Sequence, residues 1–501
     1  MTLPAHARAD YSNARQLLNS AHRRPNAVSL IHAAPGYTRR WTVREVADLV
    51  ARAASWLRNH GVGEGDHVVC CAPNDPAHLI LALACQWIGA VFVPMPVTAA
   101  PAELRMLTAI AEARVYVGTR QELADVVSPG EFFAAISAVA PIDTQPARLS
   151  EAIVAMVFTS GSSGDPKGVC LSAGALWWSA LAFRSGFGYA PASETELVCA
   201  PLSHIGGLNG TTLDVLAGGG TVVILPRFEP RQVLDTIERF RVSMGFVVPT
   251  MVRALRACPQ WPHADLSSWR RPLVGGDALP ASLARSLRRR GLEPIHVWGL
   301  TEAGGAGACL SPETAPGRDG SVGTPLPYVD IAVCDDDARP ITTAGQIGHV
   351  WIGGPGSFSG YRHDGGLQPP SWHHIAGTDL FDSGDLGFWD EQGYLTITGR
   401  ASRMIPTGGE LLAPSQVETA LIDVAGMLEA AVIGVPDDYW GQAIAAVCVP
   451  GTQALPLDEV RRLLRPHVAG WKLPRHLHYV ESLPLTASGK VDYRRLAEFF
   501  A

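Results

Sequence analysis

The chain has 501 residues, of which 47% are hydrophobic and 17% are charged, and its formal net charge is −7. This composition is that of a globular protein with a large core and excludes a disordered chain, while the length predicts two or more domains. The acidic balance offers no basic field for nucleic acid or for an anionic membrane surface.

The cysteines and the N-terminus bear on the cellular compartment. The nine cysteines are scattered and contain no CxxC pair, which predicts reduced thiols in a cytoplasmic protein. Residues 1–16 lack the charged-then-apolar layout of a signal peptide. The longest apolar stretch, residues 79–97, is interrupted by Gln86, Gly89 and two prolines. It predicts a buried helix followed by a strand and no membrane span.

The first 300 residues alternate helices with apolar strands. Apolar residues recur at helical spacing through residues 43–57, and Gly61 follows as a stop signal. An apolar strand, the helix that begins near residue 79 and a second apolar strand come next, and further apolar strands are expected at residues 221–226, 243–250 and 293–300. Strands that are apolar on both faces predict parallel sheets covered by helices, an α/β architecture.

The pattern changes from about residue 345. Short alternating runs with glycine turns predict antiparallel strands and a β-barrel-like subdomain, and they end near Arg400. The last hundred residues predict a small α+β module with helices at residues 415–422 and 457–464 and strands between them. We therefore expect an N-terminal domain of residues 1–400 and a C-terminal domain of residues 401–501.

Residues 158–169, FTSGSSGDPKGV, follow directly on a strand-like apolar run. Glycine N–H groups, hydroxyls and the single cation of Lys167 have the chemistry of an anion cradle, although an ordinary glycine- and serine-rich turn has the same composition. A Walker A loop is excluded, because Lys167 follows Pro166 and precedes Gly168. The stretch is not GxGxxG either, so a dinucleotide site is not expected.

This loop resembles the phosphate loop of the adenylate-forming enzymes, the superfamily of acyl-CoA synthetases, luciferases and peptide-synthetase adenylation domains. Further motifs of that superfamily follow in its order across almost the whole chain: PLSHIGGLNG (201–210), VGGDALP (274–280), VWGLTE (297–302), FDSGDLG (381–387), ITGR (397–400), PTGGELLAPSQVE (406–418) and LPLTASGKVDYRRL (483–496). The resemblance, closest to acyl- and aryl-CoA ligases, implies ATP-dependent activation of a carboxylic acid to an acyl-adenylate. Transfer to the thiol of coenzyme A would follow.

The resemblance also implies an ATP site. Asp385 takes the position that holds the ribose hydroxyls, Arg400 reaches the same sugar, and Trp298 replaces the usual tyrosine and offers a flat face to adenine. The full set expected to bind ATP is Thr159, Ser160, Gly161, Ser162, Ser163, Gly164, Lys167, Gly275, Gly276, Asp277, Trp298, Gly299, Asp385 and Arg400.

Four residues are expected to take part in catalysis on the same grounds. Lys490 is a point charge on a long stem that reaches the carboxylate and the bridging oxygen during attack. Thr301 would donate to the α-phosphate, and Glu302 is a hard oxygen ligand suited to Mg²⁺. His204 falls in the histidine position beside the acyl pocket.

The resemblance further implies that the C-terminal domain is mobile and rotates about a hinge just after Arg400. Ser402 takes the hinge position where Asp or Lys is usual, and Arg403 follows where an acidic residue is common. The residues expected to contact CoA are Gly408, Gly409, Trp440, Trp471, Lys472 and Arg475, and core packing is the competing interpretation of both tryptophans. Leu473 replaces a residue that is often basic.

Two alternatives to a CoA ligase stay open. A stand-alone adenylation enzyme would load an acyl carrier protein, which presents the same thiol arm, and we expect no carrier domain within residues 1–501. A non-catalytic nucleotide-binding protein would not need Lys490, so the intact set of Lys490, Glu302, Asp385 and Arg400 argues against it.

The acid itself is less defined. Relatives that activate amino acids carry an aspartate just after the histidine motif, and residues 205–209 offer none. Small and apolar residues leave room for a bulky or elongated apolar acid, either fatty or aromatic/alicyclic. Residues 174–183 are similar to succinylbenzoate-CoA ligases, so an aromatic keto-acid is a further candidate substrate. Val247 is expected to line the pocket together with His204, Gly207, Leu208, Asn209, Val248, Gly275, Gly305 and Gly307.

Overall fold

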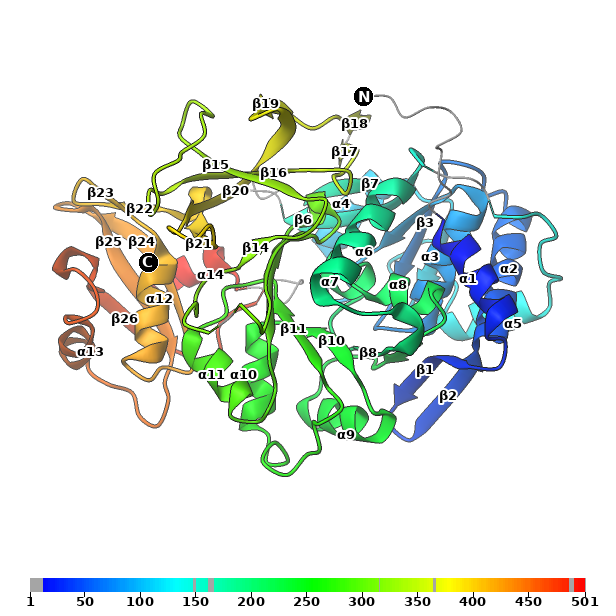
Figure 1. Ribbon diagram of the computed structural model, residues 1–501, viewed down its shortest axis with the longest axis horizontal. Coiled ribbons are helices and arrows are strands. Elements are labelled where there is room, and N and C mark those ends of the chain that lie inside the picture. The colour runs from blue at the N-terminus through cyan, green and yellow to red at the C-terminus, as the bar shows by residue number, and fades with distance from the viewer. Residues whose placement is uncertain are drawn as a thin grey trace.

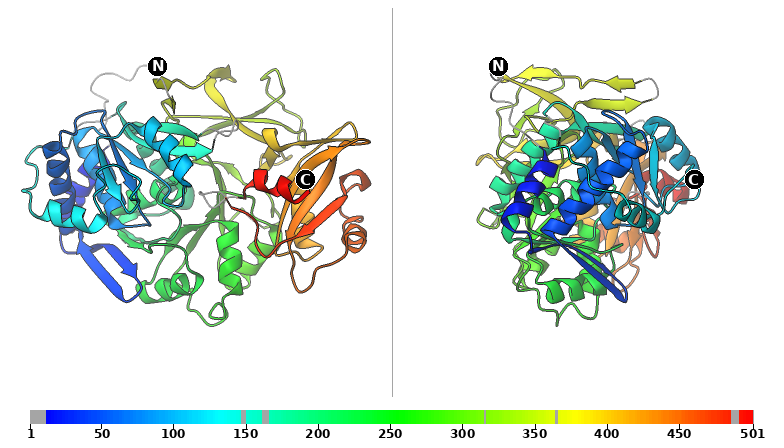
Figure 2. Two further views of the ribbon diagram at one scale, coloured as in Figure 1. Left: turned by 180° about the vertical axis from the view of Figure 1, so that it is seen from behind. Right: turned by 90° about the vertical axis from the view of Figure 1, so that its right-hand side faces the viewer.

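The computed structural model describes residues 12–146, 150–160, 166–314, 316–363, 366–485 and 491–500. The early elements gather at one end of the molecule and the C-terminal sheet lies at the other, as both faces show (Figures 1 and 2). The predicted combination of a large N-terminal domain and a small C-terminal α+β domain is confirmed.

The largest sheet has nine strands in the order β14-β13-β12-β11-β10-β8-β9-β1-β2. Its centre is parallel, as the apolar runs predicted, but the β12–β13, β13–β14 and β1–β2 pairs at its edges are antiparallel. The strands are β1 (Val28–Ala34), β2 (Tyr37–Thr42), β8 (Thr195–Val198), β9 (Thr221–Ile224), β10 (Met244–Val247), β11 (Arg271–Gly275), β12 (Ile295–Gly299), β13 (Gly307–Leu310) and β14 (Thr324–Pro325).

A second sheet has seven strands in the order β18-β17-β7-β6-β4-β3-β5. Its β6-β4-β3-β5 half is parallel, while β7, β17 and β18 add an antiparallel half. The strands are β3 (His67–Cys71), β4 (Val91–Pro94), β5 (Val115–Gly118), β6 (Ile153–Ser160), β7 (Pro166–Ser172), β17 (Gly360–His363) and β18 (Gly366–Gln368).

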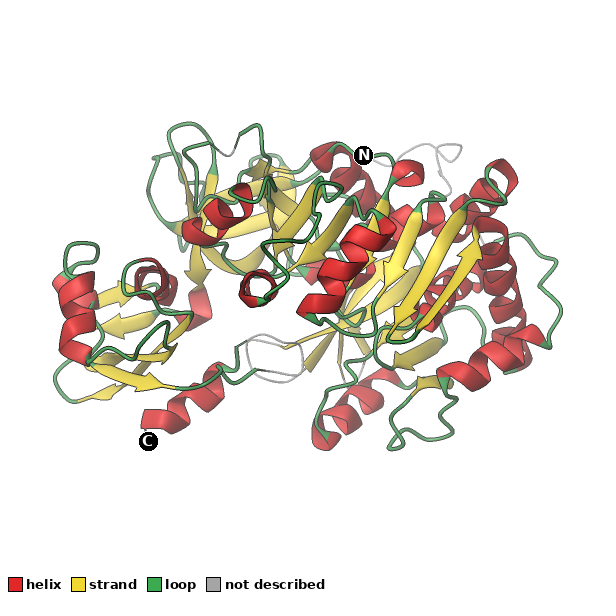
Figure 3. Cartoon of the chain, turned by 90° about the horizontal axis from the view of Figure 1, so that it is seen from below, coloured by secondary structure: helices red, strands yellow, loops and turns green. Residues whose placement is uncertain are grey.

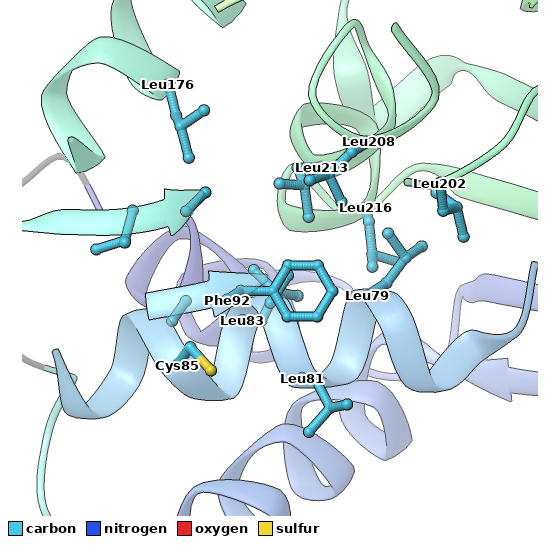
Figure 4. Packing of buried hydrophobic residues seen from close by; sticks show 14 of the residues in the cluster. Leu79, Leu81, Leu83, Cys85, Phe92, Leu176, Leu202, Leu208, Leu213 and Leu216 are labelled. Atoms are coloured by element: carbon cyan, nitrogen blue, oxygen red, sulfur yellow. The ribbon is translucent and has the colours of Figure 1, made fainter. Parts of the chain in front are cut away.

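Helix α3 (Pro76–Ile88) lies at the centre of the main core. All of its residues are buried, so it lacks the polar stripe of a surface helix. Asp75 caps its N-terminus by accepting from the backbone N–H of Ala77, and Gly89 ends it in the left-handed region. Leu79 of α3 lies beside Leu216, and Leu83 lies beside Phe92 of β4, whereas Leu81 points to the opposite side of the helix (Figure 4). This packing joins the two sheets into one body.

The other α-helices of the N-terminal domain lie around these two sheets. They are α1 (Asn13–Arg23), α2 (Val43–Asn59), α4 (Pro101–Ala111), α5 (Pro129–Ser137), α6 (Ala173–Phe187), α7 (Ile205–Leu208), α8 (Thr212–Ala217), α9 (Pro230–Phe240), α10 (Pro249–Ala257) and α11 (Ala281–Arg288). Capping boxes at Thr42 and Ser128 begin α2 and α5.

A five-stranded antiparallel sheet forms the predicted barrel-like part. It contains β15 (Asp330–Cys334), β16 (Gly348–Gly353), β19 (His373–Ile375), β20 (Thr378–Trp389) and β21 (Leu395–Arg400). The C-terminal elements follow and stand apart from this body in Figure 3. They are β22 (Ile405–Thr407), β23 (Glu410–Leu412), α12 (Pro414–Asp423), β24 (Glu429–Asp437), β25 (Gly441–Val449), α13 (Leu457–Leu464), β26 (His476–Tyr479) and α14 (Tyr493–Ala497).

The thiols agree with the sequence-based expectation. All nine cysteines are free, and eight of them are buried. Within the described ranges, no helix has both the length and the apolar character needed to cross a bilayer.

Candidate functional site

Asp385 and Arg400 form a clamp between neighbouring strands. They are direct partners in the register of β20 and β21, and the Arg400 guanidinium lies 2.8 Å from the Asp385 carboxylate. The other carboxylate oxygen accepts from the indole N–H of Trp298, at 2.9 Å, so β12 joins the clamp. The Asp385 side chain is 7% exposed and that of Arg400 is 46% exposed. Three residues predicted at the ATP site from distant motifs are therefore in contact.

A second contact set joins Lys167, Tyr361 and Glu302. The Tyr361 hydroxyl donates to Glu302 at 2.8 Å, and the Lys167 ammonium lies 5.2 Å from the centre of the Tyr361 ring. Burial and the neighbouring Glu302 carboxylate raise the pKa of Tyr361 well above its usual value, so the phenol stays protonated and donates. Tyr361 thus holds the phosphate-loop lysine and the expected metal ligand near each other.

The described residues of the expected phosphate loop lie at the end of β6 and the start of β7. Thr159 pairs with Lys167 in the register of this hairpin. Five residues of the loop fall outside the described ranges, among them Gly161, Ser162, Ser163 and Gly164, and the described part of Ser160 is its backbone. Lys490 also lies outside the described residues. Their assignments stay predictions.

The glycines expected beside adenine follow β11 and β12, at the carboxyl ends of parallel strands where ligands of α/β sheets usually bind. Gly276 has a φ of +80°, which favours glycine. A Cβ on Gly275 would lie 2.5 Å from the Val297 carbonyl, so a side chain there would clash with backbone. Asp277 is exposed and accepts from the N–H of Ala278.

The expected acyl region centres on an unpredicted ring, Phe246 of β10. A Cβ on Gly206 would lie 2.9 Å from this ring and one on Gly275 would lie 3.2 Å from it, so the ring sits between α7 and β11. Val247 was expected to line the pocket, and this is wrong. The Val247 side chain packs in a core cluster with Trp261 and Trp269, on the face of β10 opposite to Phe246. Neighbouring residues of a strand point to opposite faces of the sheet.

Residues of the histidine motif and of two other segments were expected to line the acyl pocket. Gly305 lies near Phe183 and Ile205, and Val248 is 3.2 Å from a Cβ built on Gly276. Leu208 is 1% exposed in the main core, so its side chain is not available to an acyl group. The buried amide of Asn209 donates to the Ser179 hydroxyl and to the Gly304 carbonyl. These hydrogen bonds join the histidine motif to α6 and to the segment that contains Gly304.

The other pocket predictions concern His204, Gly207 and Gly307. His204 precedes α7 and is half-buried. The segment before it is held by Asn74, which donates to the Ala200 carbonyl and accepts from the N–H of Leu202. A side chain on Gly207 would meet the Pro201 carbonyl, and one on Gly307 would meet backbone and indole of Trp298. Both glycines permit close packing.

The residues expected at the CoA site form two groups. The Arg475 guanidinium lies 3.9 Å from the centre of the Trp440 ring, and the N–H of Gly408 donates to the Trp440 carbonyl. Lys472 donates to Gln416 at 2.7 Å and lies 5.1 Å from the Trp471 ring, which packs against the C-terminal core. Trp471 therefore packs against the core of the C-terminal domain, whereas Trp440 is not part of that core cluster. Gly409 has a φ of +82° and open space around its Cα.

The hinge region contains a buried acid that the sequence did not reveal. Ser402 is exposed, while Arg403 lies 3.3 Å from Glu418 of α12 and stacks 3.5 Å from the Tyr493 ring. Glu418 also accepts from the N–H of Val432 at 2.9 Å. Burial raises the pKa of Glu418 to about 7, although Arg403 opposes the shift. The unusual Arg403 therefore contacts an acid of its own domain.

The comparisons with known proteins agree with this geometry. A family model described as AMP-binding enzyme matches residues 17–362, and one described as AMP-binding enzyme C-terminal domain matches residues 416–490. Feruloyl-CoA synthase from Amycolatopsis sp is 34% identical, covering 93% of this chain and 94% of that protein. Indoleacetate–CoA ligase from Aromatoleum aromaticum is 33% identical, covering 90% and 92%.

A solved structure extends the likeness to three dimensions. The o-succinylbenzoate CoA synthetase of Bacillus subtilis, solved in complex with its acyl-adenylate intermediate, is 25% identical with a TM-score of 0.83, covering 96% of this chain and 97% of that chain. Family, relatives and fold agree with the ordered motifs. The chain belongs to the AMP-binding enzyme family, as an ATP-dependent, AMP-forming acid–CoA ligase.

Proposed function

We propose that this ligase activates an aromatic acid and transfers the acyl group to coenzyme A. The observation that carries the choice of acid is the Phe246 ring, which stands beside Gly206 and Gly275 in the expected acyl region. A flat ring fits between an aromatic face and backbone, and it gains stacking energy there. The feruloyl-CoA synthase and the indoleacetate–CoA ligase compared above are named for acids that carry rings, which supports the same choice.

The proposed ATP site uses the two contact sets described above. Asp385 and Arg400 would hold the ribose, and Trp298 would lie against adenine. Lys167, Thr301 and the phosphate loop, Thr159 to Gly164, would bind the phosphates, since hydroxyls, N–H groups and a cation suit an anion. The Tyr361 hydroxyl takes one oxygen of Glu302. The other carboxylate oxygen suits Mg²⁺, which prefers carboxylate, phosphate and water oxygens.

We assign different steps of the reaction to the two expected domains, residues 1–400 and residues 401–501. Residues 1–400 would bind ATP and the acid, with His204 beside the acyl group, and residues 401–501 would bring Lys490 to the reacting carboxylate. Two anions meet in the adenylation step, so charge neutralisation and alignment are the main requirements. Rotation at Ser402 would then present Gly408, Gly409 and Trp440 to the pantetheine arm of CoA, with Arg475 and Lys472 near its nucleotide phosphates.

A panel of acids tests this function. Ferulate, indoleacetate, benzoate, octanoate and palmitate are each incubated with ATP, Mg²⁺ and CoA, and AMP and the thioester are quantified. We expect the highest kcat/KM with a ring-bearing acid. A higher value for palmitate would overturn the choice of an aromatic acid. AMP release that does not depend on CoA would overturn CoA as the acceptor.

The role of Lys490 gives the first specific prediction. Lys490→Ala should reduce acid-dependent exchange of pyrophosphate into ATP by at least about a hundred-fold, because a charge that stabilises a transition state is lost. Thioester formation from pre-made acyl-adenylate should stay within a few-fold of the unmodified enzyme. Lys472→Ala is the matched control, since it should affect CoA use and spare the exchange. Equal loss of both half-reactions in Lys490→Ala would contradict the assignment.

A further inference from the structure

A cavity of about 390 Å³ lies at the end of the molecule far from the C-terminal sheet. It is enclosed by the β1–β2 hairpin, α2, the start of α3 and α5, which gather at that end in Figures 1 and 2. The volume falls within the range of small-ligand pockets. No residue of the candidate ATP, acyl or CoA sites lines it.

The hairpin presents an alternating set of side chains to this cavity. Tyr37, Arg39 and Trp41 are two residues apart on β2 and therefore share one face, and His32 of β1 is the register partner of Arg39. The Trp41 ring lies nearly parallel to the Phe133 ring of α5, at an interplanar angle of 21° with centroids 6.3 Å apart. The two rings form a continuous aromatic wall.

Arg39 supplies a cation at the mouth of the cavity. Its guanidinium lies 4.7 Å from the centre of the Trp41 ring and is exposed. Among the described residues, no carboxylate pairs with it. A guanidinium over a ring, without an acidic partner, is placed to bind a carboxylate that rests against the same ring.

The base of the cavity is polar. The Nε2 atom of His32 is enclosed and has no hydrogen-bond partner among the described residues. Asp75 lines the same base, where its carboxylate accepts from the N–H of Ala77. The two side chains give this end of the cavity a polar lining.

We propose that this cavity binds a small planar aromatic carboxylate. The ring lies along the wall of Trp41 and Phe133, and the carboxylate binds Arg39. An aliphatic acid would leave the aromatic wall uncovered, and a neutral aromatic would leave Arg39 without an anion. The site is separate from the acyl pocket and does not depend on the proposed function.

Photolabelling of the full chain with 4-azidosalicylate tests this proposal. This probe carries a ring, a carboxylate and a hydroxyl, and cross-linked peptides are identified by mass spectrometry. We expect labelling within residues 37–41 or 129–137, and a loss of about ten-fold at those residues in Arg39→Gln, since a hydrogen bond to a charged group is removed. Both Arg39 and its replacement are exposed, so folding should be unaffected; a thermal melt checks this.

Arg40 provides the matched control. It is the next residue of β2, faces the other side of the hairpin and lies 5.6 Å from the Phe240 ring, so Arg40→Gln should leave labelling unchanged. The neutral probe 4-azidosalicylamide should label the cavity at least about ten-fold less efficiently. Equal labelling by the two probes, equal effects of the two substitutions, or labelling confined to the acyl region would overturn the proposal. The labelling needs neither ATP nor turnover, so a failure of the proposed function would not affect it.

Discussion

Two acidic side chains of the candidate site are held in place by neighbouring side chains. Asp385 is held by Arg400 on one oxygen and by Trp298 on the other, so its orientation is fixed before a ligand binds. Tyr361 does the same for Glu302. A prepositioned group does not have to be ordered when the ligand arrives, which favours both binding and alignment.

Phe246 gives a prediction about the choice of acid. Phe246→Ala removes the ring that stands between Gly206 and Gly275, so the acyl space should enlarge. We expect kcat/KM for a two-ring acid such as naphthoate to rise about ten-fold relative to benzoate, because a change of a few methylene volumes in a pocket is worth this much. Steady-state kinetics with the two acids measures the ratio.

Val247→Ala is the control for this prediction. Val247 follows Phe246 but packs on the other face of β10, so its truncation should lower stability and leave the ratio of the two acids unchanged. If Phe246→Ala and Val247→Ala shift the ratio equally, Phe246 does not contact the acyl group.

Elements of the C-terminal domain meet around Glu418. Arg403 follows β21, Glu418 belongs to α12, and Tyr493 begins the helix that follows the lysine motif. Their mutual contacts join the hinge segment to the segment that follows Lys490. The departure from an acidic residue at position 403 therefore has a structural reason, since a second acid beside Glu418 would leave the carboxylates without a cation.

The raised pKa of Glu418 predicts a pH-dependent stability. The folded protein keeps the Glu418 proton up to about pH 7, whereas the unfolded chain releases it near the ordinary value of 4.5. The folded state thus binds more protons between these values, and the free energy of unfolding should fall as pH rises through this window, by about 3 kcal/mol for this group.

Glu418→Gln should abolish that part of the pH dependence, because the amide does not titrate. Urea denaturation at pH 5 and pH 8, followed by tryptophan fluorescence, measures it, with Glu410→Gln of the exposed strand β23 as the control. Identical pH profiles for Glu418→Gln and the unmodified protein would show that burial of this carboxyl does not contribute.

At the scale of the whole molecule, the sequence predicted the parallel centres of the sheets and missed their antiparallel edges. Runs such as those of β3, β4 and β9 are apolar on both faces, and only a covered parallel sheet buries both. Strand β17, in contrast, has four mixed residues and pairs with β7, which is almost two hundred positions earlier. Its pairing depends on tertiary contacts that no local pattern encodes.

The candidate site was predictable for similar reasons only in part. Asp385, Arg400 and Trp298 were found because they occur in ordered motifs. Phe246 was missed because residues 244–248 are apolar throughout apart from one glycine, so alternation could not tell which face each side chain takes. Tyr361 lies outside every motif, and Glu418 ends the motif of residues 406–418, which assigns it no role. The raised pKa of Glu418 results from burial, which cannot be read from the sequence.

The contact between the two domains provides the last prediction. Ser282 of α11 donates to Asp423 at the end of α12, and Arg253 lies in the field of Asp277 of one domain and Glu429 of the other. If the C-terminal domain rotates between half-reactions, this contact exists in one arrangement only. A covalent bond at the contact should therefore preserve one half-reaction and block the other.

Cysteines introduced at both positions, Ser282→Cys with Asp423→Cys, and then oxidised would hold this arrangement. Of the native thiols, eight are buried, and only Cys258 is partly exposed, so its replacement by serine removes the competing reaction. We expect overall thioester synthesis to fall at least about ten-fold, with either pyrophosphate exchange or thioester formation from the adenylate retained, and reduction should restore the rest. The single substitutions under the same oxidation are the controls. Full activity of the completely cross-linked protein would show that both half-reactions proceed in one arrangement, and that the hinge at Ser402 is not used.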